Sequence, residues 1–395
     1  MNRFNKDIIA ALSSDKDITL NEVLRRQIEV AANQFLQNEL TVMLGYEPHT
    51  RIDRSKDDVN YRNGTYTRTI DTEYGEINLT IPRDRLNKFQ NALFPPYVRR
   101  TDGLEEMVIK MYSKGVTTRE IADMVERMYG HYYSPTTVSN ITKRTEHLVK
   151  EFHERRFKYS QYVCVFLDAT YIPLRRGTVE REAVNVAIGI RSDGGKEVLD
   201  YSIAPTENGA AWSELLQGLR ARGIKDIQLF IADGLVGLQS AIEANYPQAK
   251  FQRCWVHAER NLLGYVRKND RREIITDFKA IRQAENLQAA KERLAAFSAK
   301  WESSYKRRIK NLVQMEELFT FFSFPTAIRQ TIYSTNLIES FNKSLKKMVR
   351  RKEQFPNEGA LDHFIMTQVM EYKDKFENRA HRGFKDCHDT LDSMF

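Results

Sequence analysis

The chain has 395 residues, with 61 Lys and Arg against 53 Asp and Glu, so its formal net charge at pH 7 is +8. Hydrophobic residues make up 41% of the chain, which is too much for a disordered protein and enough for two or three domains with their own cores. The longest clean apolar run, residues 162–167, is far too short to cross a membrane. Three widely spaced cysteines fit neither a disulfide framework nor an all-cysteine zinc site. These features predict a soluble, intracellular protein, and the basic excess is compatible with nucleic-acid binding.

The first hundred residues predict a long helix followed by a β-hairpin. Apolar residues recur with a helical period over residues 21–44, and Gly45 is a residue type that commonly ends a helix. Residues 1–50 are therefore assigned to a helical region, which is a candidate for pairing two protomers. Residues 51–100 are assigned to a hairpin with strands at 65–70 and 76–81, followed by an extended connector marked by Pro82, Pro95 and Pro96.

Residues 101–158 predict three short helices. Thr117 or Thr118 can cap the second helix, and Ser134 followed by Pro135 is a typical start for the third. A hydroxyl-rich last helix in such a group indicates a helix-turn-helix DNA-binding domain, although a small three-helix packing module would have the same pattern. The side chains of the last helix that suit phosphates and base edges are Thr136, Thr137, Ser139, Asn140 and Lys143.

Beyond residue 158 the pattern changes to buried strands. Three apolar runs in a meander, a helix capped by Asn208 and a fourth strand are typical of the start of an RNase H-like α/β domain. The predicted strands are residues 162–167, 183–190, 198–204 and 227–232.

The remainder of the chain is predicted to be helical, because no strand signal returns after residue 232. The expected fold class is therefore α/β, with an RNase H-like catalytic domain interrupted by an all-α insertion and preceded by a mainly helical DNA-binding region. The first part of the catalytic domain is assigned to residues 159–247 and the insertion to residues 248–333. The last part of the catalytic domain, with the C-terminal tail, is assigned to residues 334–395.

Two aspartates each follow directly on an apolar strand run. Asp168 and Asp233 would emerge at the same carboxyl edge of the sheet if their strands are parallel neighbours, and ligands of open α/β sheets bind at that edge. Two converging carboxylates repel each other unless a cation lies between them, and oxygen ligands of this kind suit Mg²⁺ or Mn²⁺. A single aspartate after a strand would more often start a solvated loop, but two on adjacent strands favour a metal site.

Glu339 is the third candidate acid, at the head of a predicted helix. Leu337, Phe341, Leu345 and Met348 form one apolar face, and Glu339 lies on the opposite face. Glu339 could pair with Lys343, or complete a capping box with Asn336, but a metal ligand beside a phosphate-binding face explains the acid and the cations together. The basic residues that would contact DNA phosphates on this helix are Lys343, Lys346, Lys347, Arg350 and Arg351.

These residues resemble the DDE triad of bacterial insertion-sequence transposases of the Mutator type. The strings that carry the resemblance are Phe166-Leu167-Asp168-Ala169-Thr170-Tyr171, Ala232-Asp233-Gly234, Cys254-Trp255-Val256-His257 and Thr335-Asn336-Leu337-Ile338-Glu339-Ser340-Phe341-Asn342. Further similar segments are Tyr61-Arg62-Asn63-Gly64, Ile81-Pro82-Arg83-Asp84-Arg85 and the helix-turn-helix region, so the resemblance covers nearly the whole chain.

The resemblance implies a DNA transposase with Asp168, Asp233 and Glu339 as catalytic and metal-binding residues. Two Mg²⁺ ions, which Mn²⁺ could replace, would support nicking of the inverted-repeat ends by water and strand joining by the freed 3′-OH. The expected partners are the double-stranded DNA of element ends and target, with a second copy of the chain as a dimer. The expected location is the bacterial cytoplasm, with association with the nucleoid through DNA.

Cys254 and His257 match the signature of the insertion in that family. They could form half of a zinc site, but Cys164 lies in a strand and the adjacent Cys387 and His388 are poorly suited to complete it. Cys254 and His257 are therefore interpreted as structural or substrate-positioning residues. Trp255 between them is interpreted as core, with stacking on an unpaired base as the alternative.

Two rival functions share parts of this pattern. An RNase H-like nuclease would use the same carboxylates to cut branched DNA or RNA without joining strands. A non-catalytic DNA-binding regulator would use the helix-turn-helix alone, with structural acids. Neither explains the ordered set of motifs along the whole chain.

Overall fold

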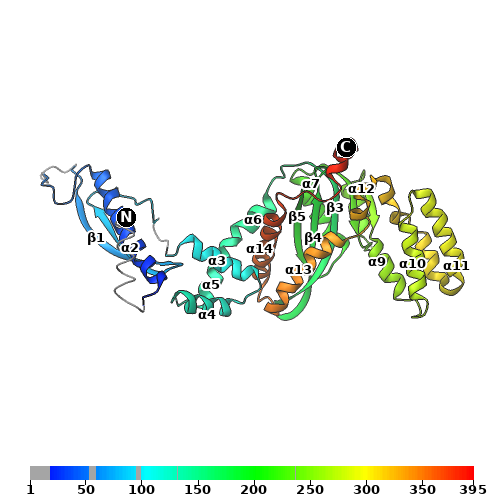
Figure 1. The fold of residues 1–395 in the computed structure, drawn as a ribbon, viewed down its shortest axis with the longest axis horizontal. Coiled ribbons are helices and arrows are strands. Elements are labelled where there is room, and N and C mark those ends of the chain that lie inside the picture. The colour runs from blue at the N-terminus through cyan, green and yellow to red at the C-terminus, as the bar shows by residue number, and fades with distance from the viewer. Residues whose placement is uncertain (1–17, 53–58, 95–98, 131, 236) are drawn as a thin grey trace. The chain divides into compact units, whose positions relative to one another are not determined.

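The computed structural model describes residues 18–52, 59–94, 99–130, 132–235 and 237–395, which form two compact units, Met1–Arg144 and Thr145–Phe395 (Figure 1). Each unit combines helices with a β-sheet. Pro95 and Pro96 of the predicted connector lie outside the described residues. In the described ranges, no helix has both the length and the apolar character that a membrane span requires.

The first unit starts with helix α2, Leu20–Leu44, and a two-stranded antiparallel sheet of β1, Arg62–Thr72, and β2, Gly75–Asp84. The side chain of Thr19 caps α2 by accepting from the backbone N–H of Glu22, and Gly45 ends the helix at φ 77°. Leu36 of α2 packs with apolar residues of both strands. The predicted helix and hairpin are thus confirmed, with strands longer than expected.

Three short helices complete the first unit. They are α3, Asp102–Ser113, α4, Thr118–Tyr129, and α5, Pro135–Thr142, and α5 packs against both of the others. Thr117 and Glu120 form a reciprocal capping box at the start of α4. Ser134 caps α5 by accepting from the N–H of Thr137, so the predicted starts of these helices are confirmed.

The second unit is built on a five-stranded sheet in the order β5-β4-β3-β6-β7. Strands β3, β4 and β5 form an antiparallel meander, and β6 lies parallel to β3 on one side and to β7 on the other. The strand bounds are β3 Gln161–Arg176, β4 Thr178–Ile190, β5 Lys196–Ala204, β6 Asp226–Ala232 and β7 Lys250–Arg253.

Two predictions about these strands are wrong. Strand β3 does not end at Asp168 but continues to Arg176, because its second half pairs with β4 as a long hairpin that turns at Gly177. Strand β7 lies inside the region predicted to be all helical. Its four residues include only one apolar side chain, Phe251, so its pairing with β6 leaves no recognisable local pattern.

Helices cover the sheet and extend from its β7 edge (Figure 1). Helix α7, Gly209–Ala221, is capped by Asn208 as predicted and packs with α8, Leu238–Asn245, in the main core. The helices after β7 are α9 Trp255–Leu263, α10 Arg271–Arg282, α11 Leu287–Val313 and α12 Thr326–Ile332, with 3₁₀ turns η2 Glu316–Leu318 and η3 Thr320–Ser323. The last elements are α13 Asn336–Lys352, α14 Glu358–Phe376, η4 Lys385–Cys387 and α15 His388–Asp392, and α13 packs against β3 while α14 packs against β5.

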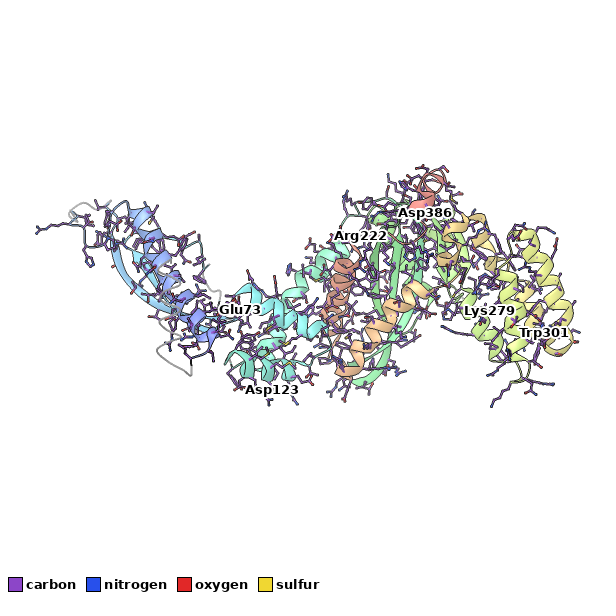
Figure 2. The ribbon with its side chains drawn as sticks, in the orientation of Figure 1. Glu73, Asp123, Arg222, Lys279, Trp301 and Asp386 are labelled. Atoms are coloured by element: carbon purple, nitrogen blue, oxygen red, sulfur yellow. The ribbon has the colours of Figure 1, made fainter. Side chains whose placement is uncertain are left out.

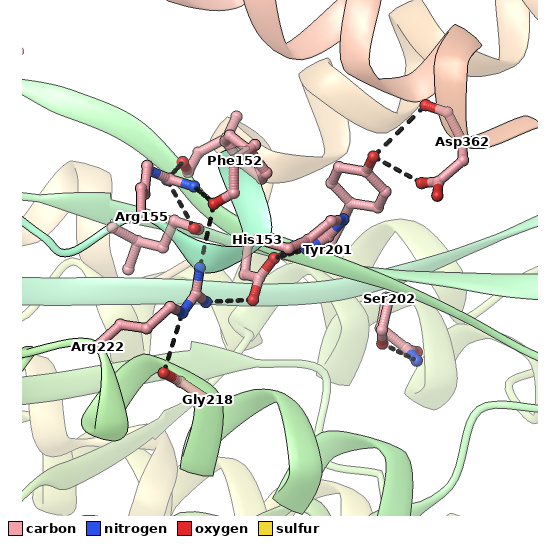
Figure 3. Close-up of polar contacts among 12 residues, drawn as sticks. Phe152, His153, Arg155, Tyr201, Ser202, Gly218, Arg222 and Asp362 are labelled. Carbon is pink, nitrogen blue, oxygen red and sulfur yellow. Dashed lines mark hydrogen bonds and ion pairs between the residues drawn. The ribbon is translucent and has the colours of Figure 1, made fainter. Parts of the chain in front are cut away.

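A polar network fixes helix α6, Glu146–Glu154, and the segment after it onto this sheet (Figure 3). The carboxylate of Asp200 on β5 contacts the imidazole of His153 at 2.8 Å and also pairs with the guanidinium of Arg222. Arg222 and Arg155 both donate to the carbonyl of Phe152. These contacts explain why the boundary between the units falls after residue 144, whereas the sequence placed it after residue 158.

Candidate active site

The two aspartates occupy matching positions on adjacent parallel strands. The last paired residues of β3 and β6 are Phe166 and Ile231. Asp168 lies two residues after Phe166 within β3, and Asp233 lies two residues after Ile231, directly after the end of β6. Because side chains two residues apart in a strand share a face, Asp168 and Asp233 project on the same side of the sheet edge. The parallel pairing that the sequence suggested is therefore present, although Asp168 itself lies inside β3.

The carboxyl group of Asp168 is held in a largely buried, negatively charged environment. The side-chain amide of Asn342 on α13 donates a 2.8 Å hydrogen bond to its Oδ2 atom. Burial, together with the charges of Asp233 and Glu339, raises the pKa of Asp168 to about 6, against the lowering effect of the Asn342 hydrogen bond. The three predicted acids are thus close enough to influence one another.

Glu339 interacts with helix α9, and its Oε1 atom also accepts a 3.4 Å hydrogen bond from the hydroxyl of Thr335, just before its own helix. Its Oε1 and Oε2 atoms accept from the Nη1 and Nη2 atoms of Arg260 at 3.0 and 3.4 Å, and Oε1 lies 3.5 Å from Nε2 of His257. The helix begins at Asn336 with Thr335 as its N-cap, which makes no side-chain cap hydrogen bond. The capping-box alternative is therefore wrong, and Glu339 pairs with Arg260 instead of Lys343.

The buried face of α13 differs by one position from the predicted one. Ile338, Phe341, Leu345 and Val349 are buried, whereas Leu337 and Met348 are only half-buried. Asn342 is also buried on this face, which explains how its amide reaches Asp168. The basic side chains of the helix that the sequence singled out, Lys343, Lys346, Lys347, Arg350 and Arg351, are all exposed.

Cys254 and His257 join the start of α9 to the start of α13 through Thr335. The Oγ1 atom of Thr335 lies 3.2 Å from Sγ of Cys254 and 3.3 Å from Nδ1 of His257. Burial raises the pKa of the Cys254 thiol, but hydrogen bonds from His257 and Thr335 outweigh this effect and bring it below its usual value. The hydrogen bond with Cys254 raises the pKa of His257. Cys164 is fully buried within β3, and Cys387 lies in η4.

Trp255 points away from this cluster into the core of the helical region. Its side chain is 1% exposed, and its ring contacts Phe278, Phe319 and Phe321 at centroid distances of 4.8 to 6.4 Å. Its indole N–H donates to the carbonyl of Leu318. An indole buried in this way has no face available to a nucleotide base.

A fourth carboxylate lies near the two aspartates. Glu207 precedes α7 and accepts a 3.2 Å hydrogen bond from the indole of Trp212. Burial raises the pKa of Glu207, and the charges of Asp233 and Asp168 raise it further. Asp168 and Glu207, whose pKa values are raised by burial and by neighbouring carboxylates, lie in the electrostatic setting that a divalent cation relieves.

The donor set at this edge fits a hard cation in its chemistry. Asp168, Asp233 and Glu339 supply carboxylate oxygens, and the buried Oδ1 atom of Asn342 has no hydrogen-bond partner among the described residues. Within the same residues, no three His, Cys, Asp or Glu side chains are already gathered closely enough to hold one ion. Glu339 is neutralised by Arg260 instead, which accounts for the incomplete cluster.

The predicted DNA-contacting residues, four in α5 and Lys143 in the 3₁₀ turn Lys143–Thr145 directly after it, are only partly accessible. Thr136, Asn140 and Lys143 are exposed, whereas Thr137 and Ser139 are half-buried. The hydroxyl of Thr137 lies 3.0 Å from that of Ser134 and belongs to the helix cap.

Four residues of this site were not singled out from the sequence: Arg260, Thr335, Asn342 and Glu207. Asn342 carried a usable signal, because it is a polar residue on an otherwise apolar helix face. Arg260 lies one turn after His257 on α9, but its pairing with Glu339 spans 79 residues of chain and leaves no local pattern.

Comparisons with known proteins identify the family of this chain. The family model described as "Transposase, Mutator family" matches residues 2–379. The chain is 47% identical over 395 residues, covering all of both chains, to the transposase for insertion sequence element IS905 of Lactococcus lactis subsp. lactis. It is 49% identical over 374 residues to the transposase for insertion sequence element IS1201 of Lactobacillus helveticus, covering 94% of this chain and 100% of the relative.

A solved structure, the Drosophila P element transposase strand transfer complex, aligns with 77% of this chain and 86% of its own at a TM-score of 0.31 and 11% identity. That similarity is too low to support any statement about function. The family match and the two bacterial relatives are sufficient by themselves: the chain belongs to the Mutator family of transposases.

Proposed function

We propose that this protein is an insertion-sequence transposase of the DDE type, in which the five-stranded sheet is an RNase H-like catalytic core. It would bind the inverted-repeat ends of its element, nick them and join the freed ends to other DNA. The observation that carries the proposal is the matched register of Asp168 and Asp233, with Glu339 and Asn342 brought to them by α13.

The proposed reaction consists of two displacements at phosphorus. In the first, a water oxygen attacks a phosphodiester at the element end, the bond between phosphorus and the 3′ oxygen breaks, and a 3′-OH and a 5′-phosphate result. In the second, that 3′-OH attacks another phosphodiester, so one phosphorus–oxygen bond forms as another breaks. Neither step requires a covalent bond to the protein.

Asp168, Asp233 and Glu339 would hold Mg²⁺, or Mn²⁺ in its place, with two ions in the full site. Bound there, such ions supply Lewis-acid chemistry, activating the attacking oxygen and stabilising the leaving oxygen of an in-line displacement. In the protein itself, Asn342 orients the Asp168 carboxylate. Arg260 holds Glu339 as its counter-ion, and its exposed guanidinium is of the kind that would bind a DNA phosphate.

The DNA would be bound by two sets of side chains with different tasks. The exposed cations of α13, from Lys343 to Arg351, would contact backbone phosphates close to the carboxylates. The exposed side chains of Thr136 and Asn140 on α5, with Lys143 directly after it, would read base edges as part of a helix-turn-helix. The active form would be a dimer on paired element ends, working in the bacterial cytoplasm and associated with the nucleoid through DNA.

The test uses labelled duplex DNA that spans the boundary of the element encoding this chain. The protein is incubated with this DNA and Mg²⁺, beside an Asp168→Asn variant. The proposal predicts nicks that leave a 3′-OH at one boundary, followed by joined strands, and neither product with the variant. Cutting without joining would indicate a nuclease, and binding with no cutting by either protein would indicate a regulator. Both results would overturn the proposal.

A further inference from the structure

The helical region after β7 carries a cluster of cations at the far end of α9. Four of them, Arg267, Lys268, Arg271 and Arg272, lie between the end of α9 and the first turn of α10, and all four side chains are exposed. None of the four takes part in an ion pair within the described part of the chain.

The second half of α11 adds four more cations to the same surface. Three of them, Lys306, Arg307 and Lys310, are exposed, and Arg308 places its guanidinium 3.3 Å from the ring centroid of Tyr265, just after α9. Tyr265 itself remains 58% exposed. These eight cations are called the insertion basic patch below.

Direct contacts hold the two halves of the insertion basic patch together. The hydroxyl of Tyr305 on α11 donates to the carboxylate of Asp270 and accepts from the backbone N–H of Arg267 at 3.2 Å. Helices α10 and α11 also pack side by side, with Lys279 on the former and Trp301 on the latter (Figure 2). The patch is therefore one surface of this unit.

The carboxylates nearest to the patch are already engaged. Asp270 accepts from Tyr305, and Glu273 pairs with Lys300 at 2.6 Å. Arg271 and Arg272 moreover occupy the first turn of α10, where the positive end of the helix dipole disfavours cations. Arg271 donates from Nε to the carbonyl of Val266 at 3.1 Å, but no ion pair within the described residues balances the charge of these cations, and this charge suits an external polyanion.

The position of the patch identifies the polyanion as DNA. Helix α9 starts at Trp255, next to the carboxylate site, carries Arg260, and ends at Leu263 beside the patch. Nine residues of helix span about 13 Å, which is the axial length of about four base pairs. The patch therefore lies within a few base pairs' length of the carboxylate site, measured along α9.

We propose that the insertion basic patch binds the phosphate backbone of DNA flanking the cleavage site, without reading its sequence. This inference rests on the proposed function for the identity of the substrate. It assigns to the helical insertion a DNA-contacting role separate from the cations of α13 and from α5.

The test compares three proteins on a labelled duplex of about four helical turns at several salt concentrations. The patch variant carries Lys268→Gln, Arg272→Gln, Lys306→Gln and Lys310→Gln. The control variant removes the same charge elsewhere in the unit, through Lys225→Gln, Lys291→Gln, Lys373→Gln and Lys385→Gln, all at exposed positions. We expect the patch variant to bind at least tenfold more weakly at about 0.1 M salt. The slope of its log affinity against log salt concentration should be less negative than that of wild type by roughly two to four. The control should stay within threefold of wild type.

A second measurement uses the unmodified protein. Acetylation of surface lysines is followed by mass spectrometry with and without the duplex, and DNA should protect Lys268, Lys306 and Lys310 but not Lys291 or Lys385. Equal binding and salt slope for the patch and control variants, or no protection at the patch, would overturn the inference. Failure of the proposed function would look different, as DNA binding by wild type without Mg²⁺-dependent nicking.

Discussion

The side-chain amide of Asn342 on α13 donates a hydrogen bond of 2.8 Å to the carboxylate of Asp168 on β3, across 174 residues of chain. This bond connects the helix that carries Glu339 to the strand that carries the first aspartate. It also opposes the effect of burial on the pKa of Asp168. The position of Glu339 on α13 and the ionisation of Asp168 therefore both depend on the buried amide of Asn342.

Replacing this amide should shift the pH dependence of strand cleavage. Because the hydrogen bond from Asn342 lowers the pKa of Asp168, Asn342→Ala raises that pKa above about 6. The ionised carboxylate then forms only at higher pH, so the rising limb of the cleavage profile moves to the alkaline side by about half a unit or more. Profiles of nicking rate against pH test this, with the exposed Ser344→Ala as control. A profile that does not move would show that Asp168 does not limit the rate there.

Removing the charge of Asp168 should stabilise the metal-free protein. The pKa is raised from 3.8 to about 6 in the fold, so the free energy of unfolding falls as pH rises through this window and stays lower above it. At pH 7.5, Asp168→Asn lacks this penalty of at most about 3 kcal/mol, since one pKa unit corresponds to about 1.4 kcal/mol.

Thermal unfolding without divalent cations provides the measurement. We expect a higher Tm for Asp168→Asn at pH 7.5 and no gain below about pH 3, where the wild-type carboxyl is protonated in both states. The exposed Asp374→Asn should change neither value. A lower Tm for Asp168→Asn at pH 7.5 would contradict the raised pKa.

The early part of the fold was predictable because its signals are local. Thr117, Ser134 and Asn208 cap helices through hydrogen bonds to residues three positions ahead, so each start could be recognised from a few letters. The hairpin of β1 and β2 was recognised for the same reason, since its turn joins adjacent strands.

The elements that escaped prediction depend on distant partners. The buried residue of β7 is Gln252, whose side-chain amide donates to the carbonyl of Leu318 and accepts from the N–H of Phe321. From the sequence alone, a glutamine would be expected at the surface. Asp168 and Asp233 could be predicted from their positions after apolar strand runs. The pairing of Glu339 with Arg260 could not be predicted. The prediction for α13 placed Leu337 on the buried face, whereas Ile338 is buried there. The two side chains are similarly apolar, so the sequence could not distinguish them.

The Glu339 carboxylate should contribute little to stability and much to activity. Its partner Arg260 has 57% of its side chain exposed, and exposed pairs of this kind are worth about 1 kcal/mol or less. We expect Glu339→Gln to change Tm by less than about 3 °C while reducing nicking by more than about a hundredfold. Arg260→Gln breaks the same pair but keeps the carboxylate, and should retain more nicking activity than Glu339→Gln. Comparable activity of Glu339→Gln and wild type would remove this residue from the catalytic site.

The loop after Asp233 should be sensitive to a single methyl group. Gly234 adopts φ +88°, and a Cβ atom there would lie 2.1 Å from Nε of Arg253, whose Nη2 atom donates to the Gly234 carbonyl at 2.9 Å. Gly177 has the same φ but no neighbouring atom within 4 Å of its Cβ position. Gly177→Ala therefore isolates the backbone strain, on the order of 1–2 kcal/mol, while Gly234→Ala also displaces Arg253.

We expect both alanine variants to lose stability in denaturant titrations, with Gly234→Ala losing at least as much as Gly177→Ala. Only Gly234→Ala should lose nicking activity, by tenfold or more, because the segment that positions Asp233 has moved. Equal loss of activity in the two variants would indicate that the contact with Arg253 does not position this loop.

The most direct measurement replaces the three acids with cysteine, one at a time, and compares Mg²⁺ with Mn²⁺ in the nicking assay. A thiolate is a poor ligand for Mg²⁺ and a better one for Mn²⁺. If Asp168, Asp233 and Glu339 hold the cation, Asp168→Cys, Asp233→Cys and Glu339→Cys should be inactive with Mg²⁺ and recover nicking with Mn²⁺. Full nicking with Mg²⁺ by folded Asp168→Cys or Asp233→Cys protein would contradict the proposal that these carboxylates form the catalytic site.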